Sequence, residues 1–316
     1  MTRAPGILRA LTRSPVAPYA AVAASAMSWG TWGLIVRRVD AIQPVSPALQ
    51  SAVLFCVMAA VSGFTSLRDR VVRPAPWRAR LGVAFYGVSD ALNVSLFFAA
   101  YKITIAPAVL SHYLTPLLVA LAAPFVLRER MTTRTGFAVA ASFTGLAVML
   151  APSGQGDRAA VWVSAALGAG SAVFYASNVL VNKLIADSFS TSEATFWHCL
   201  VAAPLLAAFV PPDAWAHTDP RAVGLFALAS LGPGATAGLV FLWGLRRMPA
   251  AHASTLTLLE PLVSIVLGTS VMGERLGALA LTGAALILAG AAVVASAPAG
   301  TPAEGRATKL EAEGES

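Results

Sequence analysis

The sequence predicts an all-α polytopic membrane protein of ten transmembrane helices, arranged as two inverted five-helix repeats. Three observations lead to this fold class: a very apolar composition, apolar runs of membrane-spanning length, and an internal repeat at an offset of 145 residues. Of the 316 residues, 57% are hydrophobic and 12% are charged, and the mean hydropathy is +0.71. A soluble domain needs far more charge to cover its surface, so a soluble fold is excluded.

The apolar residues occur in runs of roughly 20, the length that a helix needs to cross a hydrocarbon core of about 30 Å. Apolar and polar residues do not alternate, so strands are not expected. The ten expected spans are residues 17–36, 45–67, 79–101, 104–127, 133–151, 159–182, 190–210, 221–245, 249–272 and 277–296.

The spans divide the chain into two repeats with polar ends. Residues 17–151 are predicted to form the first repeat, 159–296 the second, and 152–158 a linker between them. Residues 1–16 are expected to form a basic cytoplasmic tail. Residues 297–316 are polar, and their Gly, Glu, Lys and Thr content predicts a disordered cytoplasmic tail.

The 22 Lys and Arg residues are distributed unevenly between alternate loops. If the N-terminus lies in the cytoplasm, 16 of them fall in cytoplasmic segments and 6 in outside segments. This bias follows the positive-inside rule, so both termini are predicted to lie on the cytoplasmic side of the cell (inner or plasma) membrane. The net charge of +7 then requires no nucleic-acid partner.

An internal repeat appears when the chain is aligned with itself at an offset of 145 residues. Alanine and leucine matches are expected by chance in so biased a sequence, but matches of proline, a charged pair and glycine in one ungapped register are not. Five spans is an odd number, so the second half is predicted to be inverted relative to the first, as in several alternating-access transporters. The matched residues are Pro116 with Pro261, Glu129-Arg130 with Glu274-Arg275, and Gly145 with Gly290.

Residues 106–145 and 251–290 resemble the paired EamA-type repeat of the drug/metabolite transporter superfamily. The resemblance rests on the shared spacing from proline to Glu-Arg and on Leu-Glu-Pro at 259–261. It implies ten helices around a central cavity, and export or exchange of amino acids, related metabolites or drugs, often coupled to protons. Family members often carry an arginine early in the second helix. This chain has Gln50 and Ser51 there, so no anion site is expected at that position.

Ionisable groups at bilayer depth cost roughly 2.5–3.5 kcal/mol on insertion scales, so an intramembrane carboxylate is a candidate functional residue. Asp90 lies near the middle of its span, and Asn93 follows about one helical turn later, so both can face one cavity. Glu260 lies mid-span before Pro261. We predict that Asp90 and Glu260 face the cavity, that one of them exchanges protons, and that His112 assists.

Structural roles remain open for the same residues. Glu260 could instead bond to backbone groups that Pro261 leaves unpaired, and His112 could be an interhelical polar contact. Asn178 is a further candidate polar contact to the solute. Four aromatic residues could either line the cavity and stack on an amine or aromatic solute, or serve as packing: Trp29, Trp32, Tyr175 and Trp243.

No sequence motif of a hydrolase, metalloenzyme or nucleotide-binding protein is present. No enzyme activity, cofactor or metal is therefore expected, and transport would draw on an ion or solute gradient. The expected partners are a small-molecule substrate, membrane lipid and, as a candidate coupling ion, protons. A monomer could suffice because one chain carries both orientations, and a homodimer remains open. The alternatives are a channel, a non-transporting membrane scaffold or, less favoured, an intramembrane enzyme.

Overall fold

A computed structural model of the chain describes residues 14–69, 75–103, 105–149, 157–272 and 278–296. All regular secondary structure in these ranges is helical. Several predicted features lie outside the described residues: most of the N-terminal tail, the C-terminal tail, nearly all of the linker, and the Glu274-Arg275 pair.

Each of the ten predicted apolar stretches coincides with one helix or with consecutive helices. The elements are α2 (Ala17–Trp29), α3 (Trp32–Asp40), α4 (Pro47–Asp69), α5 (Trp77–Ile103), α6 (Ile105–His112), α7 (Thr115–Val126), α8 (Thr133–Met149), α9 (Arg158–Leu184), α10 (Thr191–Ala208), α11 (Pro212–His217), α12 (Pro220–Ala229), the π-helix η1 (Ser230–Thr236), α13 (Ala237–Leu245), α14 (Ala250–Leu256), α15 (Leu259–Met272) and α16 (Ala278–Ala295).

Six helical stretches among the described residues are long and apolar enough to cross a membrane. The chain is thus an all-α polytopic membrane protein, while the count of ten crossings remains a prediction. The outward surface agrees with this class, because large apolar side chains such as Phe125, Phe137 and Leu67 are 87%, 73% and 79% exposed. Such a surface is unfavourable in water and favourable against lipid acyl chains. The six stretches are Pro47–Asp69, Trp77–Ile103, Pro107–Val126, Arg158–Leu184, Pro220–Leu245 and Ala250–Gly268.

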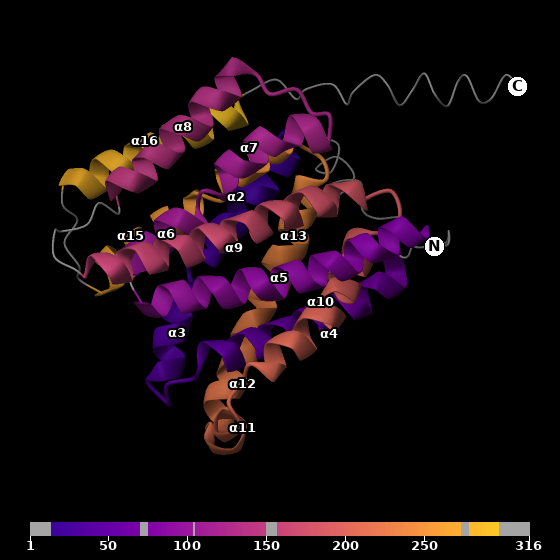
Figure 1. Cartoon of the computed structure of the whole chain (residues 1–316), viewed down its shortest axis with the longest axis vertical. Coiled ribbons are helices and arrows are strands. Elements are labelled where there is room, and N and C mark those ends of the chain that lie inside the picture. The colour runs from indigo at the N-terminus through magenta and orange to yellow at the C-terminus, as the bar shows by residue number, and fades with distance from the viewer. Residues whose placement is uncertain (1–13, 70–74, 104, 150–156, 273–277, 297–316) are drawn as a thin grey trace, which may run out of the picture.

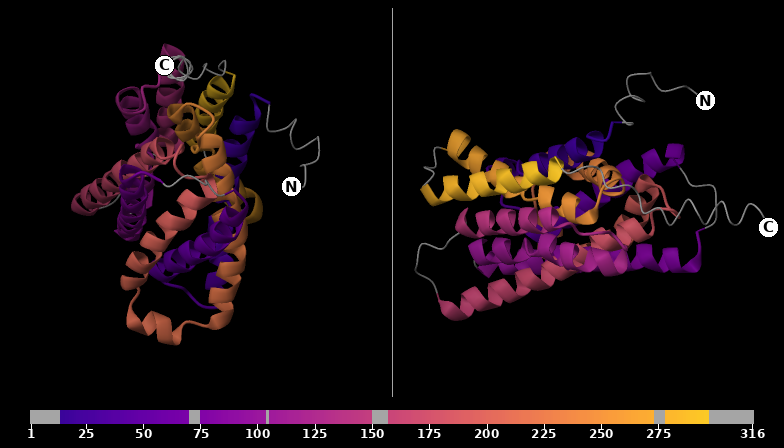
Figure 2. Two further views of the ribbon diagram at one scale, coloured as in Figure 1. Left: turned by 90° about the vertical axis from the view of Figure 1, so that its right-hand side faces the viewer. Right: turned by 90° about the horizontal axis from the view of Figure 1, so that it is seen from above.

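Helices from the two halves of the chain pack against each other. In Figure 1, α8 and α16 lie side by side at one edge of the bundle, and α5 lies beside α9 in its middle. Further pairs are α4 with α10 and α2 with α13. The right-hand view in Figure 2 shows many of these helices running roughly along one common axis. Each half therefore depends on the other for much of its buried surface.

The contact between α8 and α16 is symmetric in the repeat. A Cβ atom added to Gly145 would lie 2.6 Å from the carbonyl oxygen of Gly283, and one added to Gly290 would lie 2.7 Å from that of Ala138. Residues 138 and 283 are themselves 145 apart. The two helices are antiparallel, because Arg134 at the start of α8 donates to Ser296 just after α16. A local pseudo-two-fold axis therefore passes between them.

Hydrogen bonds show that several helices begin or finish at the same end of the bundle. His252 at the start of α14 contacts the Tyr19 hydroxyl near the start of α2 and the Thr135 hydroxyl at the start of α8. Ser192 at the start of α10 donates to Asp69 at the end of α4. These segments all belong to the set that the charge bias predicts to be cytoplasmic. We call the end of the bundle at His252 the 252 end.

Candidate functional site

The carboxylate of Asp90 is the centre of a polar cluster in the middle of the bundle. Asp90 lies at the midpoint of α5 and is 17% exposed. Its Oδ1 atom accepts hydrogen bonds from the Asn178 side chain at 2.9 Å and from the Asn93 side chain at 3.2 Å. Its Oδ2 atom lies 3.3 Å from His198 Nε2. Three helices, α5, α9 and α10, therefore contribute to one carboxylate site.

Close packing of small residues brings these helices together. Ser89 and Ser177 bond across the α5–α9 contact at 2.8 Å, and the Ser171 hydroxyl donates to the Asn93 side chain at 2.7 Å. On the other side of α5, a Cβ atom at Gly87 would lie 2.7 Å from the carbonyl oxygen of His198. Glycine at this position lets α10 approach closely enough for His198 to reach the carboxylate.

His198 is a site residue that the sequence analysis did not select. Its side chain is 1% exposed and stacks on the Tyr86 ring, with ring centroids 4.1 Å apart and planes 13° apart. A histidine in the middle of an apolar span is, like Asp90, a rare ionisable residue at bilayer depth, so that signal was present in the sequence. Its partner could not be read from the sequence, because the contact depends on how α5 and α10 pack.

The predicted residue His112 lies in the same polar network but contacts neither carboxylate directly. Its Nδ1 atom lies 2.8 Å from the Ser171 hydroxyl, which in turn bonds to Asn93. The His112 ring stacks on Tyr175, with centroids 5.4 Å apart and planes 11° apart. His112 is thus joined to Asp90 through Ser171 and Asn93.

The second carboxylate, Glu260, has the Tyr113 hydroxyl as its hydrogen-bonding partner. Tyr175 lies within electrostatic range of both Glu260 and Asp90. Tyr175 is therefore the residue through which Glu260 is electrostatically connected to the polar cluster. Five of the predicted residues lie in that cluster: Asp90, Asn93, Asn178, His112 and Tyr175.

Both repeats contain a helix that is interrupted at this depth. The break between α6 and α7 falls at residues 113–114, and that between α14 and α15 at 257–258, each a few residues before a proline. The Thr115 hydroxyl donates to the His112 carbonyl at 2.8 Å, which replaces the N–H that Pro116 lacks. Interrupted helices at mid-depth typically line substrate sites in transporters.

The predicted tryptophans lie apart from the polar cluster. Trp29 packs on Phe241 with centroids 5.0 Å apart, and Trp32 stacks on Phe226 at 5.4 Å. Trp243 lies beneath the guanidinium of Arg247, 4.3 Å from its ring centroid, near the end of α13. In this structure these three rings pack on neighbouring side chains, and their role as cavity walls stays a prediction.

The side-chain oxygen of Asn178 lacks a hydrogen-bonding partner. The residue is 4% exposed, and its Nδ2 atom donates to Asp90, which leaves Oδ1 as a buried acceptor. A buried polar atom without a partner is costly and calls for an explanation. Asp90 and Asn178 together offer two acceptors to a donor of positive charge.

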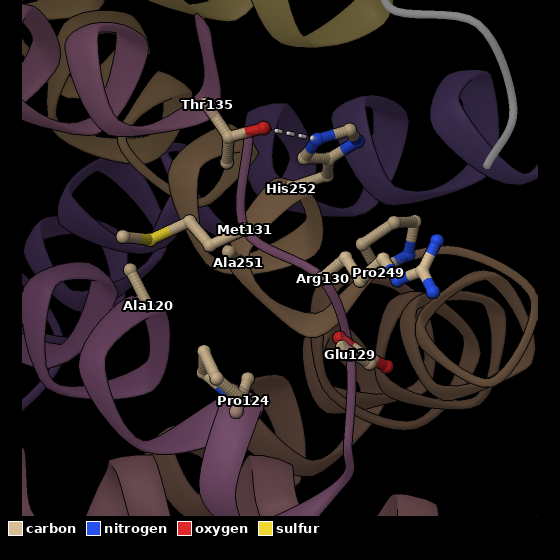
Figure 3. A pocket seen from close by; sticks show the side chains of 10 residues that line it. Ala120, Pro124, Glu129, Arg130, Met131, Thr135, Pro249, Ala251 and His252 are labelled. Atoms are coloured by element: carbon tan, nitrogen blue, oxygen red, sulfur yellow. Dashed lines mark hydrogen bonds between the residues drawn. The ribbon is translucent and has the colours of Figure 1, made fainter. Parts of the chain in front are cut away.

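A second group of polar residues surrounds a small pocket at the 252 end (Figure 3). His252 lies between the Tyr19 hydroxyl at 2.9 Å and the Thr135 hydroxyl at 3.0 Å. The Glu129 carboxylate forms an ion pair with Lys183 and accepts the backbone N–H of Ala250 at 2.7 Å. These contacts tie α2, α8, α9 and α14 together at this end of the bundle.

The fold and the site define a polytopic membrane protein with a polar centre at mid-depth. The sequence profile of the EamA-like transporter family matches residues 17–151 and 162–296. The chain therefore belongs to the EamA-like transporter family.

Relatives with assigned names are also described as transporters. Over 177 residues the chain is 29% identical to the "Uncharacterized transporter YwfM" of Bacillus subtilis (strain 168), a match that spans 55% of this chain and 58% of that protein. Over 220 residues it is 30% identical to an "Uncharacterized transporter" of Archaeoglobus fulgidus, a match that spans 68% of this chain and 75% of that protein.

A crystal structure of a protein of 23% sequence identity has the same fold. It aligns with a TM-score of 0.75 over 90% of this chain and 100% of the other.

Proposed function

We propose that this chain is a secondary transporter that moves a small cationic or zwitterionic solute, such as an amino acid, a related metabolite or an organic cation, by alternating access. One observation carries the proposal: the Asp90 carboxylate and the unpartnered Asn178 oxygen lie side by side at the middle of the bundle. Both are acceptors, so a solute ammonium group would satisfy both and be held by charge-assisted hydrogen bonds. Family membership supports transport as the activity.

Proton exchange is the proposed means of coupling. A charge at bilayer depth is costly, so the site is favoured when its net charge stays near zero. His198 Nε2 lies 3.3 Å from Asp90 and is the counter-ion when protonated. A solute ammonium that binds Asp90 replaces protonated His198 as the counter-ion. The proton of His198 is then released to the opposite side of the membrane. Glu260, bonded to Tyr113, is the second carboxylate and is proposed to pass this proton on, so that coupling needs both residues.

The same proposal includes ten membrane crossings in two inverted repeats. The antiparallel, symmetric contact of α8 with α16 supports this arrangement, as do the matched breaks before Pro116 and Pro261. The repeats are proposed at residues 17–151 and 159–296. We assign the 252 end to the cytoplasm of the cell (inner or plasma) membrane, with both chain termini on that side, because the Lys- and Arg-rich segments gather there.

The test is uptake and counterflow in proteoliposomes, with amino acids and organic cations screened in the presence and absence of an imposed pH gradient. Asp90→Asn is expected to lower both uptake and counterflow at least tenfold, because the counter-charge for the ammonium is lost. Glu260→Gln is expected to lose gradient-driven accumulation and to keep counterflow. Asp213→Asn, in the exposed helix α11, is the control and is expected to behave as wild type.

Three results would contradict the proposal. Normal transport by Asp90→Asn would exclude Asp90 as the solute's counter-charge. Solute flux that does not depend on an imposed pH gradient or on counterflow would indicate a channel. The absence of any flux in the wild-type protein would favour a scaffold role.

A further inference from the structure

A second pair of unpartnered groups lies one helical turn from the Asp90 centre, toward the 252 end. Asn182 follows Asn178 by four residues on α9, a rise of about 6 Å along the helix. The Asn182 side chain is fully buried, at 0% exposure, and its Nδ2 atom has no hydrogen-bonding partner. Here the unpartnered atom is a donor, whereas at Asn178 it is an acceptor.

The guanidinium of Arg246 lies against Asn182 and has an unpartnered donor of its own. Its Nε atom donates to Asn182 Oδ1 at 2.9 Å, and Nη1 donates to the Phe189 carbonyl at 2.7 Å. Its Nη2 atom is buried without a partner. The carboxylates of Asp69 and Asp187 lie within electrostatic range of Arg246.

The guanidinium keeps its charge despite its burial. Arg246 follows the last residue of the α13 span, and burial lowers the pKa of its guanidinium to about 10, which still leaves it protonated at neutral pH. A partly buried cation with an unpartnered buried donor, beside a second unpartnered donor, is complementary to an anion. Arginine suits this role because it can present several N–H groups to one carboxylate.

The two donor groups and the Asp90 centre belong to one column of polar residues. Tyr86 lies within electrostatic range of both Asp90 and Arg246, and its ring stacks on His198. The acceptors Asp90 and Asn178 are at one level of the column, and the donors are about one helical turn away. A solute that carries an ammonium group and a carboxylate separated by a few bonds matches this order of acceptors and donors.

We propose that Arg246 and Asn182 form an anion-binding site that takes the carboxylate of the transported solute. The site extends the proposed function, because the same solute would place its ammonium at Asp90. A small inorganic anion such as chloride offers the same chemistry, and the experiment separates the two sources. A zwitterionic solute would then be bound through both its ammonium and its carboxylate, and a simple amine through its ammonium alone.

The experiment measures binding to the full-length protein purified in detergent, with phenylalanine and phenethylamine as probes. These differ by the carboxylate alone. Arg246→Gln is expected to raise the Kd for phenylalanine at least tenfold and to change that for phenethylamine less than twofold. Asn182→Asp is expected to do the same, since it keeps the acceptor for Arg246 and replaces the free donor by a negative charge.

Arg247→Gln is the matched control. It removes an arginine at the same end of α13, but Arg247 is exposed, and its guanidinium lies over Trp243. It is expected to change neither Kd. An equal loss of both probes in Arg246→Gln and Asn182→Asp would overturn the proposal and assign Arg246 a structural role at Phe189. If Arg246→Gln fails to fold, Asn182→Asp decides alone, because it retains the Arg246 hydrogen bond.

A second measurement separates this proposal from the proposed function. Acetate and chloride are titrated separately, and protection against thermal unfolding is compared between wild type and the two variants. If the wild-type protein binds neither phenylalanine nor phenethylamine, yet acetate protects it and neither variant, the anion site stands and the solute class fails. Two outcomes would overturn the carboxylate site. In one, acetate protects the wild type and both variants equally against thermal unfolding. In the other, chloride protects the wild type and acetate does not compete with it.

Discussion

The helices α6 and α14 occupy equivalent positions in the two repeats, yet their surroundings differ. Their first residues, Ile105 and Ala250, are separated by the repeat offset of 145 residues. All seven residues of α14 are buried. In α6, Ala108 and Ser111 are buried, while Ile105 is 55% exposed and His112 is partly exposed. The two halves therefore share a fold and differ in the burial of this helix. The proposed alternating access would require a difference of this kind, because the two halves of such a transporter exchange environments.

The contacts of α14 explain why it is buried. Glu129 accepts the Ala250 N–H at the start of α14 and pairs with Lys183 at the end of α9. An acidic group at a helix N-terminus is favourable because it satisfies a free N–H and complements the helix dipole. His252 adds two hydrogen bonds to other helices. Variants at Glu129 and His252 should therefore reduce the difference between α14 and α6.

The largest effect is expected from Glu129→Gln. The neutral amide loses the ion pair with Lys183 and weakens the bond to Ala250, so α14 should spend more time separated from α9. We expect a cysteine at Ala251 to react at least tenfold faster with a membrane-impermeant maleimide added from the 252 end. The measurement uses a background in which Cys56 and Cys199 are replaced by alanine.

The control for this labelling experiment is Arg130→Gln. Arg130 also lines the pocket at the 252 end, but the ion pair of Glu129 is with Lys183, so labelling at position 251 should stay at the parent rate. An unchanged rate in Glu129→Gln would show that Glu129 does not hold this end closed.

A smaller, matched effect is expected at the symmetric contact of α8 with α16. Gly145→Ala and Gly290→Ala each force a Cβ atom against a backbone carbonyl of the partner helix, and overpacking of this kind costs about 1–3 kcal/mol. Both should lower the thermal unfolding temperature in detergent by similar amounts. Gly136→Ala, also in α8 but with no atom within 4 Å of the added Cβ, should be neutral or slightly stabilising.

The two halves are thus expected to be energetically equivalent at α8 and α16, while they differ at α6 and α14. A loss of stability in one of the two glycine variants alone would show that the symmetry of the contact does not extend to its energetics.

The smallest effect is expected from His252→Phe. The ring keeps its volume and loses hydrogen bonds to Tyr19 and Thr135, each worth about 0.5–1.5 kcal/mol net. We expect a modest drop in unfolding temperature and a rise in Ala251→Cys labelling well below that of Glu129→Gln. Tyr19→Phe removes one of the same bonds and should give about half the drop. Labelling as fast as in Glu129→Gln would assign the closure to His252 instead.

Much of the fold could be predicted from the sequence, because hydropathy and the repeat are properties of the chain alone. Among the described residues, the apolar runs coincide with every helical element except the short helix α11, which lies between two predicted spans, and two of the runs are interrupted just before Pro116 and Pro261. The breaks fall before the prolines, where the lost N–H is replaced locally, as by Thr115. The π-helix η1 around Pro233 was not predicted, since no periodicity distinguishes it from an α-helix.

The candidate site was harder to predict, because its contacts join residues distant in sequence. Asp90 was selected by its cost at bilayer depth, and Asn93 by its helical spacing from Asp90. His198 reaches Asp90 only because Gly87 allows α10 to approach α5 closely. The donors of Asn182 and Arg246 stand out only once their other atoms are seen to be bonded.

The symmetric packing of Gly145 and Gly290 has a consequence for the origin of the chain. Gly145 faces Gly283, and Gly290 faces Ala138, which is the repeat counterpart of Gly283. The interface between the two helices is therefore self-complementary. Two separate copies of one half, inserted in opposite orientations, could form the same contact. An ancestor of half the length could therefore have assembled as an antiparallel dimer, and gene fusion would have required a connection between the copies and no new interface.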